Sequence, residues 1–373
     1  MSTQREKVVV AMSGGVDSSV AAALLLREGY DVMGVFMRLG SPDGVEEPEV
    51  CDTTPGAKSK QGCCSVLDAA DARRVAGVLG IPLYVLNFQD DFGRVIDYFV
   101  DEYNRGRTPN PCVRCNDWLK FGKLARYAEA VGARYVASGH YARTGIDPRS
   151  GEAALLRGVD HRKDQSYVLF GMTRQTLAHT LLPIGGYEKP AVRAIAEELK
   201  LPVFNKPDSQ EICFVPNQDY AGLVKRRSPD AFRPGELVTT SGDVVGRHEG
   251  HQHFTIGQRR GTGVALGHPI YVVDIDPASN RVTVGDRTAT LRGSLIANQI
   301  NLLSSRLSES AGEITCQAKI RYNHAPQPAT ARVVGDELHV RFAEPQHAIT
   351  PGQAVVLYDN DVVLGGGWID RAD

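Results

Sequence analysis

The sequence predicts an α/β protein whose first half is a doubly wound parallel sheet and whose second half is rich in β-strands. Up to about residue 215, short apolar runs alternate with helical patterns, which is typical of a parallel sheet with helices on both faces. Beyond that point the helical periodicity gives way to short alternating runs broken by Gly, Pro, Asn and Asp, which favour antiparallel strands. At 373 residues the chain is also too long for one ordinary core. We therefore expect a sheet domain over 1–215, a small central β-rich domain over 216–285 and a C-terminal β-barrel over 286–373.

The elements of the first half follow one another in regular alternation. Residues 8–12 form a short β-branched run that predicts a buried strand, and a glycine turn leads from it into an expected helix over 18–28 that ends near Gly29. The further strands expected here are 32–37, 83–86 and 135–137, and the further helices are 69–79, 91–103 and 118–130. The alternating runs of the second half include 270–275, 281–284, 331–334 and 354–358. We expect right-handed crossovers between the parallel strands.

Charge and cysteine content narrow the classes of function. The formal net charge is −2, so the chain lacks the basic surface of a general nucleic-acid-binding protein, although local basic clusters leave an RNA partner open. Seven cysteines is an odd number, and the first residues lack the apolar core of a secretory signal, so we expect reduced thiols in the cytoplasm. No apolar run is long enough to span a bilayer, so we expect no membrane partner.

A glycine-rich loop joins the first expected strand to the first expected helix. It reads Met12-Ser13-Gly14-Gly15-Val16-Asp17-Ser18-Ser19. Adjacent glycines let the backbone turn tightly so that its N–H groups face an anion, and the helix N-terminus behind them adds partial positive charge. The lysine of a GxxxxGK loop and the spacing of GxGxxG are both absent. A plain strand–helix connection with Ser18 as the helix N-cap is the alternative interpretation.

The string SGGVDSS in this loop is similar to the loop of the PP-loop ATP pyrophosphatase superfamily, whose fold is adenine nucleotide alpha hydrolase-like. Those enzymes cleave ATP between the α and β phosphates, adenylate a carbonyl-type oxygen and release pyrophosphate. The resemblance implies ATP with Mg²⁺, and Asp17 would assist the metal ion. Met37, at the end of the second expected strand, would contact the adenine. The nucleotide contacts implied in this way are Ala11, Met12, Ser13, Gly14, Gly15, Val16, Asp17, Ser18, Met37 and Gly139.

Strings along the whole chain carry a more specific resemblance. They include GCCS at 62–65, RTPNP at 107–111, SGHY at 138–141, KDQSY at 163–167, DSQEICF at 208–214, HFTIGQR at 253–259 and TPGQ at 350–353. In this order they resemble the bacterial tRNA 2-thiouridylases, the MnmA family, from end to end. The resemblance implies ATP-dependent 2-thiolation of the wobble uridine in the anticodon stem-loop of tRNAs for Lys, Glu and Gln. The sulfur would come from a cysteine desulfurase or a sulfur-relay protein.

Cysteines are the candidates for the sulfur chemistry. Cys112 and Cys115 follow a Pro-rich loop, and a thiol near a helix N-terminus and beside Arg114 ionises more readily than a free one. By resemblance, Cys115 is the nucleophile and Cys213 carries a persulfide. The persulfide sulfur would pass to the adenylated base while a Cys115–Cys213 disulfide forms.

Cys112 departs from the pattern of the family. Many members have Asp at this position, assigned to contact the target base, and a thiol is a poor substitute for it. The departure opens an alternative in which Cys112, Cys115 and Cys213 hold a [4Fe-4S] cluster that carries sulfide. The remaining cysteines, which we expect to be loop or core residues, are Cys51, Cys63, Cys64 and Cys316.

The resemblance also implies contacts with tRNA. Asn110, Pro111 and Cys112 would line the pocket of the wobble base, which must leave the anticodon stack to react. Lysine and arginine hold phosphates, whereas histidine and tyrosine stack on bases. The residues expected to contact the anticodon region are His140, Lys163, Asp164, Gln165, Arg321, Tyr322 and Gln353.

Other classes of function remain open from the residues alone. Amide-forming ligases use the same phosphate loop but need no paired cysteines. An ATP- or RNA-binding module without turnover would need neither thiol. Pyrophosphate release that depends on tRNA distinguishes the thiolating enzyme from both.

Overall fold

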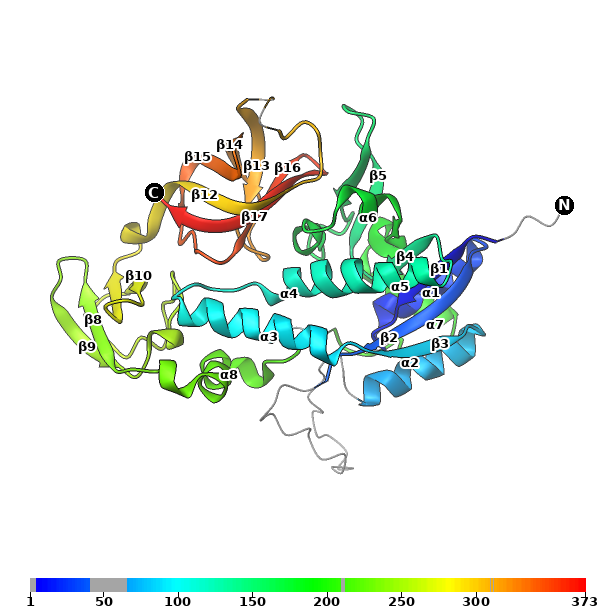
Figure 1. Cartoon of the computed structure of the whole chain (residues 1–373), viewed down its shortest axis with the longest axis horizontal. Coiled ribbons are helices and arrows are strands. Elements are labelled where there is room, and N and C mark those ends of the chain that lie inside the picture. The colour runs from blue at the N-terminus through cyan, green and yellow to red at the C-terminus, as the bar shows by residue number, and fades with distance from the viewer. Residues whose placement is uncertain (1–4, 41–65, 209–211, 309, 311) are drawn as a thin grey trace. The chain divides into compact units, whose positions relative to one another are not determined.

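The computed structural model describes residues 5–40, 66–208, 212–308, 310 and 312–373 (Figure 1). The chain divides into two compact units: the first is Met1–Val95 with Cys112–Gln218, and the second is Ile96–Pro111 with Asp219–Asp373. Three of the expected loop or core cysteines, Cys51, Cys63 and Cys64, lie outside the described residues. Within the described ranges, no helix is long and apolar enough to cross a membrane.

A parallel sheet forms the centre of the first unit. Its strands are β1 (Lys7–Ala11), β2 (Asp31–Arg38), β3 (Leu83–Asn87), β4 (Tyr135–Ser138) and β7 (Thr180–Leu181). They lie in the order β3-β2-β1-β4-β7, and each neighbouring pair is parallel. The parallel sheet expected from the alternating pattern is therefore confirmed, with small differences at the strand ends.

Helices account for much of the rest of the first unit, and α3 continues from it into the second unit. They are α1 (Val16–Arg27), α2 (Val66–Leu79), α3 (Gln89–Asn104), α4 (Pro111–Arg114), the π-helix η1 (Cys115–Lys123), α5 (Leu124–Ala130), α6 (Arg174–Ala178) and α7 (Lys189–Glu198). Short 3₁₀ turns, η2 (Ser166–Leu169) and η3 (Pro183–Gly186), and a hairpin of β5 (Ala142–Ile146) and β6 (Ala153–Arg157) complete it.

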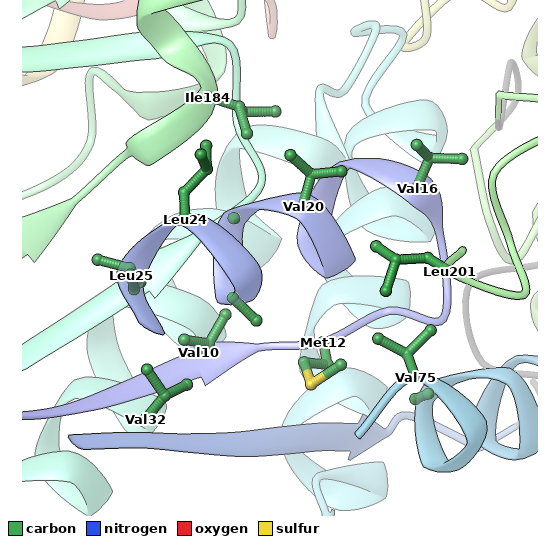
Figure 2. Close-up of a cluster of buried hydrophobic side chains, with 14 of the residues drawn as sticks. Val10, Met12, Val16, Val20, Leu24, Leu25, Val32, Val75, Ile184 and Leu201 are labelled. Atoms are coloured by element: carbon green, nitrogen blue, oxygen red, sulfur yellow. The ribbon is translucent and has the colours of Figure 1, made fainter. Parts of the chain in front are cut away.

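Aliphatic side chains fill the space between the sheet and helices α1 and α2 (Figure 2), and α7 contributes to the same buried cluster. Val10 of β1 and Val32 of β2 belong to one buried cluster with Val20 of α1, Val75 of α2 and Val192 of α7. The small side chains in the α1 sequence VDSSVAAALLLR let this helix lie close to the sheet. Burial of such apolar surface stabilises the fold by about 25 cal/mol per Å². The loop between β1 and α1 is therefore anchored at both ends in this buried cluster.

Helical segments begin earlier than the sequence predicts. Helix α1 starts at Val16 because Gly15 is its N-cap, so Ser18 lies in the first turn and is not the cap. The helix expected over 118–130 begins at Pro111, passes through the π-helix and ends as α5. Proline is favoured at the first helical position because its missing N–H would have no intrahelical partner there.

A small sheet lies in the second unit. Its strands are β8 (Gly235–Thr239), β9 (Val244–His248), β10 (Tyr271–Asp276) and β11 (Arg281–Gly285), in the order β10-β11-β8-β9. The pair β11–β8 is parallel, so the expectation of purely antiparallel strands is wrong here. Helix α8 (Tyr220–Arg227) precedes this sheet and was also not predicted. Leu237, Val272 and Val282 form part of its core.

The C-terminal strands form a closed barrel, as the sequence predicts. They are β12 (Leu291–Leu302), β13 (Ile314–Lys319), β14 (Gln327–Val334), β15 (Glu337–His347), β16 (Ala354–Asp359) and β17 (Val362–Ala372). Antiparallel pairing runs through β12-β15-β14-β13-β16-β17, and β12 pairs with β17 to close the ring. Closure removes the free sheet edges that would otherwise pair with other chains.

Candidate functional site

The loop between β1 and α1 has a backbone suited to binding an anion. Gly14 has φ +71°, and a Cβ placed there would lie 2.2 Å from the backbone oxygen of Asp68, so only glycine fits. Helix α1 has twelve residues and begins after Gly15, and within the described residues no side chain caps it. Its first N–H groups are thus open to a ligand, and the helix dipole favours a negative charge there.

The loop also lies where ligands bind in open parallel sheets. The strand order reverses between β1 and β4, and the carboxyl ends of these adjacent strands meet at the loop. Gly139 follows β4 directly, and a Cβ there would lie 2.5 Å from the backbone nitrogen of Ser18. The close approach of Gly139 to α1 therefore also requires glycine.

Several predicted nucleotide residues can act only through their backbone. The side chains of Ala11, Met12 and Val16 are buried in the core. The Ser18 hydroxyl accepts a hydrogen bond from the Ser13 backbone N–H at 3.2 Å, which shapes the loop from inside. Met37 is half-buried near the end of β2.

Asp17 lies in a network of charges that the sequence did not reveal. The Tyr141 hydroxyl donates to Asp17 Oδ1 at 2.8 Å, and Lys189 Nζ donates to both carboxylate oxygens at 2.8 and 2.9 Å. Lys189 also forms an ion pair with Asp208 at 2.8 Å. Burial and the neighbouring Asp17 carboxylate raise the pKa of Tyr141, so its phenol stays protonated. No local pattern could have found Lys189 or Tyr141, because both are remote from Asp17 in sequence.

Asp208 is the second carboxylate of this network and forms ion pairs with three cationic side chains. Lys163 lies 2.9 Å and Arg193 lies 2.8 Å from its carboxylate oxygens, in addition to Lys189. Burial alone would raise the pKa of Asp208, but hydrogen bonds from Lys189 and Lys163 lower it to about 2. The carboxylate therefore stays ionised at neutral pH and holds the three cations beside the loop.

The structure does not favour Asp17 as a ligand for Mg²⁺. Its carboxylate accepts hydrogen bonds from Lys189 and Tyr141, which take up most of its acceptor positions. Mg²⁺ in nucleotide sites is held largely by phosphate oxygens and water. The expectation that Asp17 assists the metal ion therefore has no support from the arrangement of its neighbours.

The thiols of the first unit occupy different environments. Cys112 is exposed and lies in the first turn of the helical run that begins at Pro111, whereas Cys115 begins the π-helix and is half-buried. Cys213 is half-buried, and all three are reduced thiols. The Arg114 guanidinium lies over the Trp118 ring, 5.2 Å from its centroid. A π-helix is rare and often marks a functional position, and no sequence pattern predicts it.

The described residues bring no group of three or more Cys, His, Asp or Glu side chains together in a form that could hold a metal ion. The arrangement of Cys112, Cys115 and Cys213 therefore does not fit the three-thiolate ligand set that an iron–sulfur cluster requires.

The segment 163–165 is held mainly by hydrogen bonds within the chain. Asp164 is buried, and its carboxylate accepts from Arg157 Nε, from the backbone N–H groups of Gly158 and Ser166 and from the Ser166 hydroxyl. Gln165 Oε1 accepts from the Tyr141 N–H at 2.9 Å. These two side chains shape the loop, and the buried position of Asp164 is at odds with the predicted direct contact with tRNA.

His140 is buried and uncharged. Its Nδ1 lies 2.7 Å from the Ser138 hydroxyl, and its ring packs against Phe121. Burial, together with the nearby Lys120, lowers the pKa of His140 well below its usual value. The ring can thus offer a polar edge to a ligand but not a positive charge for a phosphate.

In the second unit, the predicted residue Gln353 holds the loop that precedes the thiols. Its Nε2 donates to the carbonyl oxygens of Thr108 at 3.0 Å and Pro109 at 2.9 Å, and its Oε1 lies 3.5 Å from Asn110 Nδ2. Arg107 binds Glu102 and Asp370 in the same region. This loop reaches Pro111, where the helical run with Cys112 and Cys115 begins.

Two further predicted residues lie after β13 in the same unit. The Arg321 guanidinium donates to the Ala348 carbonyl oxygen, and Tyr322 is exposed. The Lys319 ammonium lies 5.6 Å from the Tyr322 ring centroid. Of this pair, Tyr322 presents the more accessible surface.

Family models match three parts of the chain. Residues 6–217 match a tRNA methyl transferase HUP domain, residues 223–286 a tRNA methyl transferase PRC-barrel domain, and residues 292–369 an aminomethyltransferase beta-barrel domain. Proteins named tRNA-specific 2-thiouridylase MnmA align over 98% of this chain. The protein from Clostridioides difficile is 48% identical, with 99% of its own length covered; that from Carboxydothermus hydrogenoformans is 50% identical, with 98% covered. The one from Rhodopirellula baltica is 48% identical, with 96% covered. The chain belongs to the tRNA-specific 2-thiouridylase family.

Membership of the 2-thiouridylase family confirms the resemblance drawn from the sequence. The domain descriptions name methyltransferases, whereas the full-length relatives are named 2-thiouridylases. The relatives cover nearly the whole chain at about half identity, so their name defines the family.

Proposed function

We propose that the chain is an ATP-dependent tRNA sulfurtransferase that replaces the 2-carbonyl oxygen of the wobble uridine with sulfur in the cytoplasm. The observation that carries the proposal is the uncapped N-terminus of α1 at the point where the strand order reverses. It occurs in a chain that aligns over 98% of its length with proteins named for 2-thiolation. We take the substrates to be tRNAs for Lys, Glu and Gln.

In the first step the uridine O2 attacks the α-phosphorus of ATP, and pyrophosphate leaves. The backbone N–H groups of Gly14, Gly15 and the first turn of α1 bind the phosphates that develop charge. Adenylation turns the carbonyl oxygen into part of a good leaving group, AMP. Met37 and Gly139 line the adenosine end of the same site.

In the second step the terminal sulfur of a persulfide on Cys213 attacks C2 of the base. The Cys115 thiolate then attacks Cys213 Sγ, the bond between Cys213 and the transferred sulfur breaks, and AMP leaves with the former carbonyl oxygen. The products are the thiolated tRNA and a Cys115–Cys213 disulfide, which a cellular thiol must reduce before another turnover. A cysteine desulfurase or a sulfur-relay protein supplies the sulfur to Cys213.

Each unit by itself contains candidate residues for contacts with tRNA. We assign Lys163 and Arg321 to phosphate contacts and Tyr322 to a base or ribose contact. Asn110, Pro111 and Cys112 line the pocket of the target base, and His140 offers a neutral hydrogen-bonding edge. Asp164, Gln165 and Gln353 contribute indirectly, because their side chains hold the neighbouring loops in place.

The test is 2-thiolation of tRNA by protein purified without oxygen, with ATP, cysteine, a cysteine desulfurase as the persulfide donor and a thiol reductant, followed by mass spectrometry of the nucleosides. Iron content is measured on the same samples, and wild type is compared with Cys112→Ala, Cys115→Ala and Cys213→Ala. We expect an active protein without iron, activity in Cys112→Ala and none in the other two variants. Stoichiometric iron in wild type that is lost in all three variants would show that a cluster, and not a persulfide, carries the sulfur. A wild type that thiolates no tRNA would refute the function itself.

A further inference from the structure

We propose that Lys206 is a positioning residue for the nucleotide: it binds the Gly14 carbonyl oxygen from behind the loop and thereby turns the Gly15 N–H toward the phosphates. The inference deepens the proposed function and rests on it, because it takes ATP as the ligand of the 12–18 loop.

Lys206 is fixed behind the loop by three acceptors. Its Nζ donates to Gly14 O at 3.0 Å, to Asp68 Oδ1 at 2.6 Å and to Asp71 Oδ2 at 2.6 Å. A lysine ammonium has three N–H donors, so this geometry can use every one of them. The Lys206 side chain is 14% exposed and that of Asp68 is 6% exposed. Burial alone would lower the pKa of Lys206, but the hydrogen bonds to both carboxylates raise it, so the ammonium stays charged.

The geometry of the peptide bond transmits this contact to the phosphate side. In a trans peptide the C=O of one residue and the N–H of the next point in opposite directions. Gly14 O points to Lys206, and the Gly14 Cα lies against the backbone of Asp68 at the start of α2. The Gly15 N–H must therefore point away from α2. A flipped peptide would instead turn the Gly14 oxygen toward the anion and repel it.

Lys206 also balances the charge behind the loop. Asp71 pairs with Arg74 as well as with Lys206, so the group of Lys206, Arg74, Asp68 and Asp71 has two positive and two negative charges. Removal of the lysine would leave one net negative charge directly behind a site for triphosphate. Peptide orientation and charge thus act in the same direction, and the experiment must separate them.

The experiment measures the affinities of ATP, inorganic pyrophosphate and AMP by calorimetry, with no tRNA and no turnover. Lys206→Met removes both the hydrogen bond and the charge. Lys206→Met combined with Asp68→Leu restores the net charge of this four-residue group without a donor for Gly14 O. Lys200→Met, an exposed lysine shortly after α7, is the matched control, and thermal unfolding is recorded for each protein.

We expect ATP and pyrophosphate to bind at least about tenfold more weakly to both Lys206 variants, because the Gly15 N–H is no longer held toward the phosphates and its hydrogen bond to a charged ligand is weakened. AMP, which lacks the β and γ phosphates, should bind with nearly wild-type affinity. Wild-type affinity for ATP in the double variant would overturn the peptide-orientation argument. Equal weakening for AMP and ATP would show that Lys206 serves only the fold.

Different results would refute the role of Lys206 and the proposed function. If wild type binds ATP and both folded Lys206 variants bind it equally well, only the role of Lys206 is refuted. If wild type binds no ATP, the nucleotide site and the proposed function are refuted with it. If wild type binds ATP and Lys206→Met does not, yet no tRNA is thiolated, the positioning role stands and the reaction is wrong.

Discussion

The ionisation of individual charged residues in the first unit depends on partners that are far away in sequence. Asp17 and Asp208 share the ammonium group of Lys189, which begins α7. Removal of one partner from such a network leaves the others with uncompensated charge, which is usually more destabilising than the intact network is stabilising. The consequences can be measured through pH and through chemical reactivity.

Asp208→Asn should lower the stability of the protein near neutral pH. The folded-state pKa of Asp208, about 2, lies below the ordinary value, so its contribution is fully present above about pH 4 and is lost as the pH falls through 2. The difference in unfolding free energy between wild type and variant should therefore shrink between pH 4 and 2. Denaturant unfolding at several pH values measures it, with Asp31→Asn at an exposed position as the control. A difference that stays constant over this range would contradict the assignment.

Cys316 should resist alkylation at neutral pH. Burial, with Asp359 nearby, raises the pKa of its thiol to about 12, and the thiolate is the reactive form. Cys112 is exposed and should be modified much faster. Peptide mass spectrometry after timed treatment with iodoacetamide compares the two residues in the same sample. Rapid modification of Cys316 in folded protein would show that the barrel interior is more open than its burial implies.

At the scale of elements, the loop before the thiols depends on a turn of the barrel. The Thr108 N–H donates to Pro351 O at 2.9 Å, and Gln353 donates to Thr108 O and Pro109 O. Gly352 has φ +89°, and a Cβ there would lie 2.9 Å from Thr108 O. The turn at residues 350–353, with the sequence TPGQ, therefore fixes the backbone that leads to Asn110 in the second unit.

Gln353→Ala should lower tRNA thiolation and leave ATP affinity unchanged. The variant frees two loop carbonyl groups, each hydrogen bond contributing about 1 kcal/mol, while the phosphate loop belongs to the other unit. Gln327→Ala is the control, because that amide donates locally to Ala325 O. Thiolation rates and ATP titration provide the two readouts. Equal loss of both would point to general unfolding instead.

At the scale of the whole molecule, the proposed reaction separates activation from sulfur transfer. The nucleotide loop and the thiols lie in different segments of the first unit, so removal of a thiol leaves the loop intact. Cys213→Ala should release pyrophosphate in a tRNA-dependent manner yet form no thiolated nucleoside. A coupled phosphate assay with and without tRNA measures this release. Its absence would mean that the thiol is needed before adenylation.

Local patterns predicted the elements that depend on nearby residues. The β-branched run of β1, the alanine-rich α1 and the glycine turn between them carry their own signals, since side-chain periodicity reflects which face is buried. The parallel pairing of β8 with β11 was missed because strand direction is decided by partners distant in sequence. The π-helix at Cys115 was missed because apolar periodicity does not report a single wider turn.

By itself, the sequence determined the fold class, the position of the phosphate loop and the resemblance to the 2-thiouridylases, because each rests on residues that are contiguous or in a fixed order. The domain limits and the roles of Cys115 and Cys213 stay predictions. Only the tertiary structure decided that Asp164 is buried and that Lys189 binds Asp17. It also decided that Lys206 lies behind Gly14. Charges and hydrogen bonds act through space, and folding brings together groups that the order of residues keeps far apart.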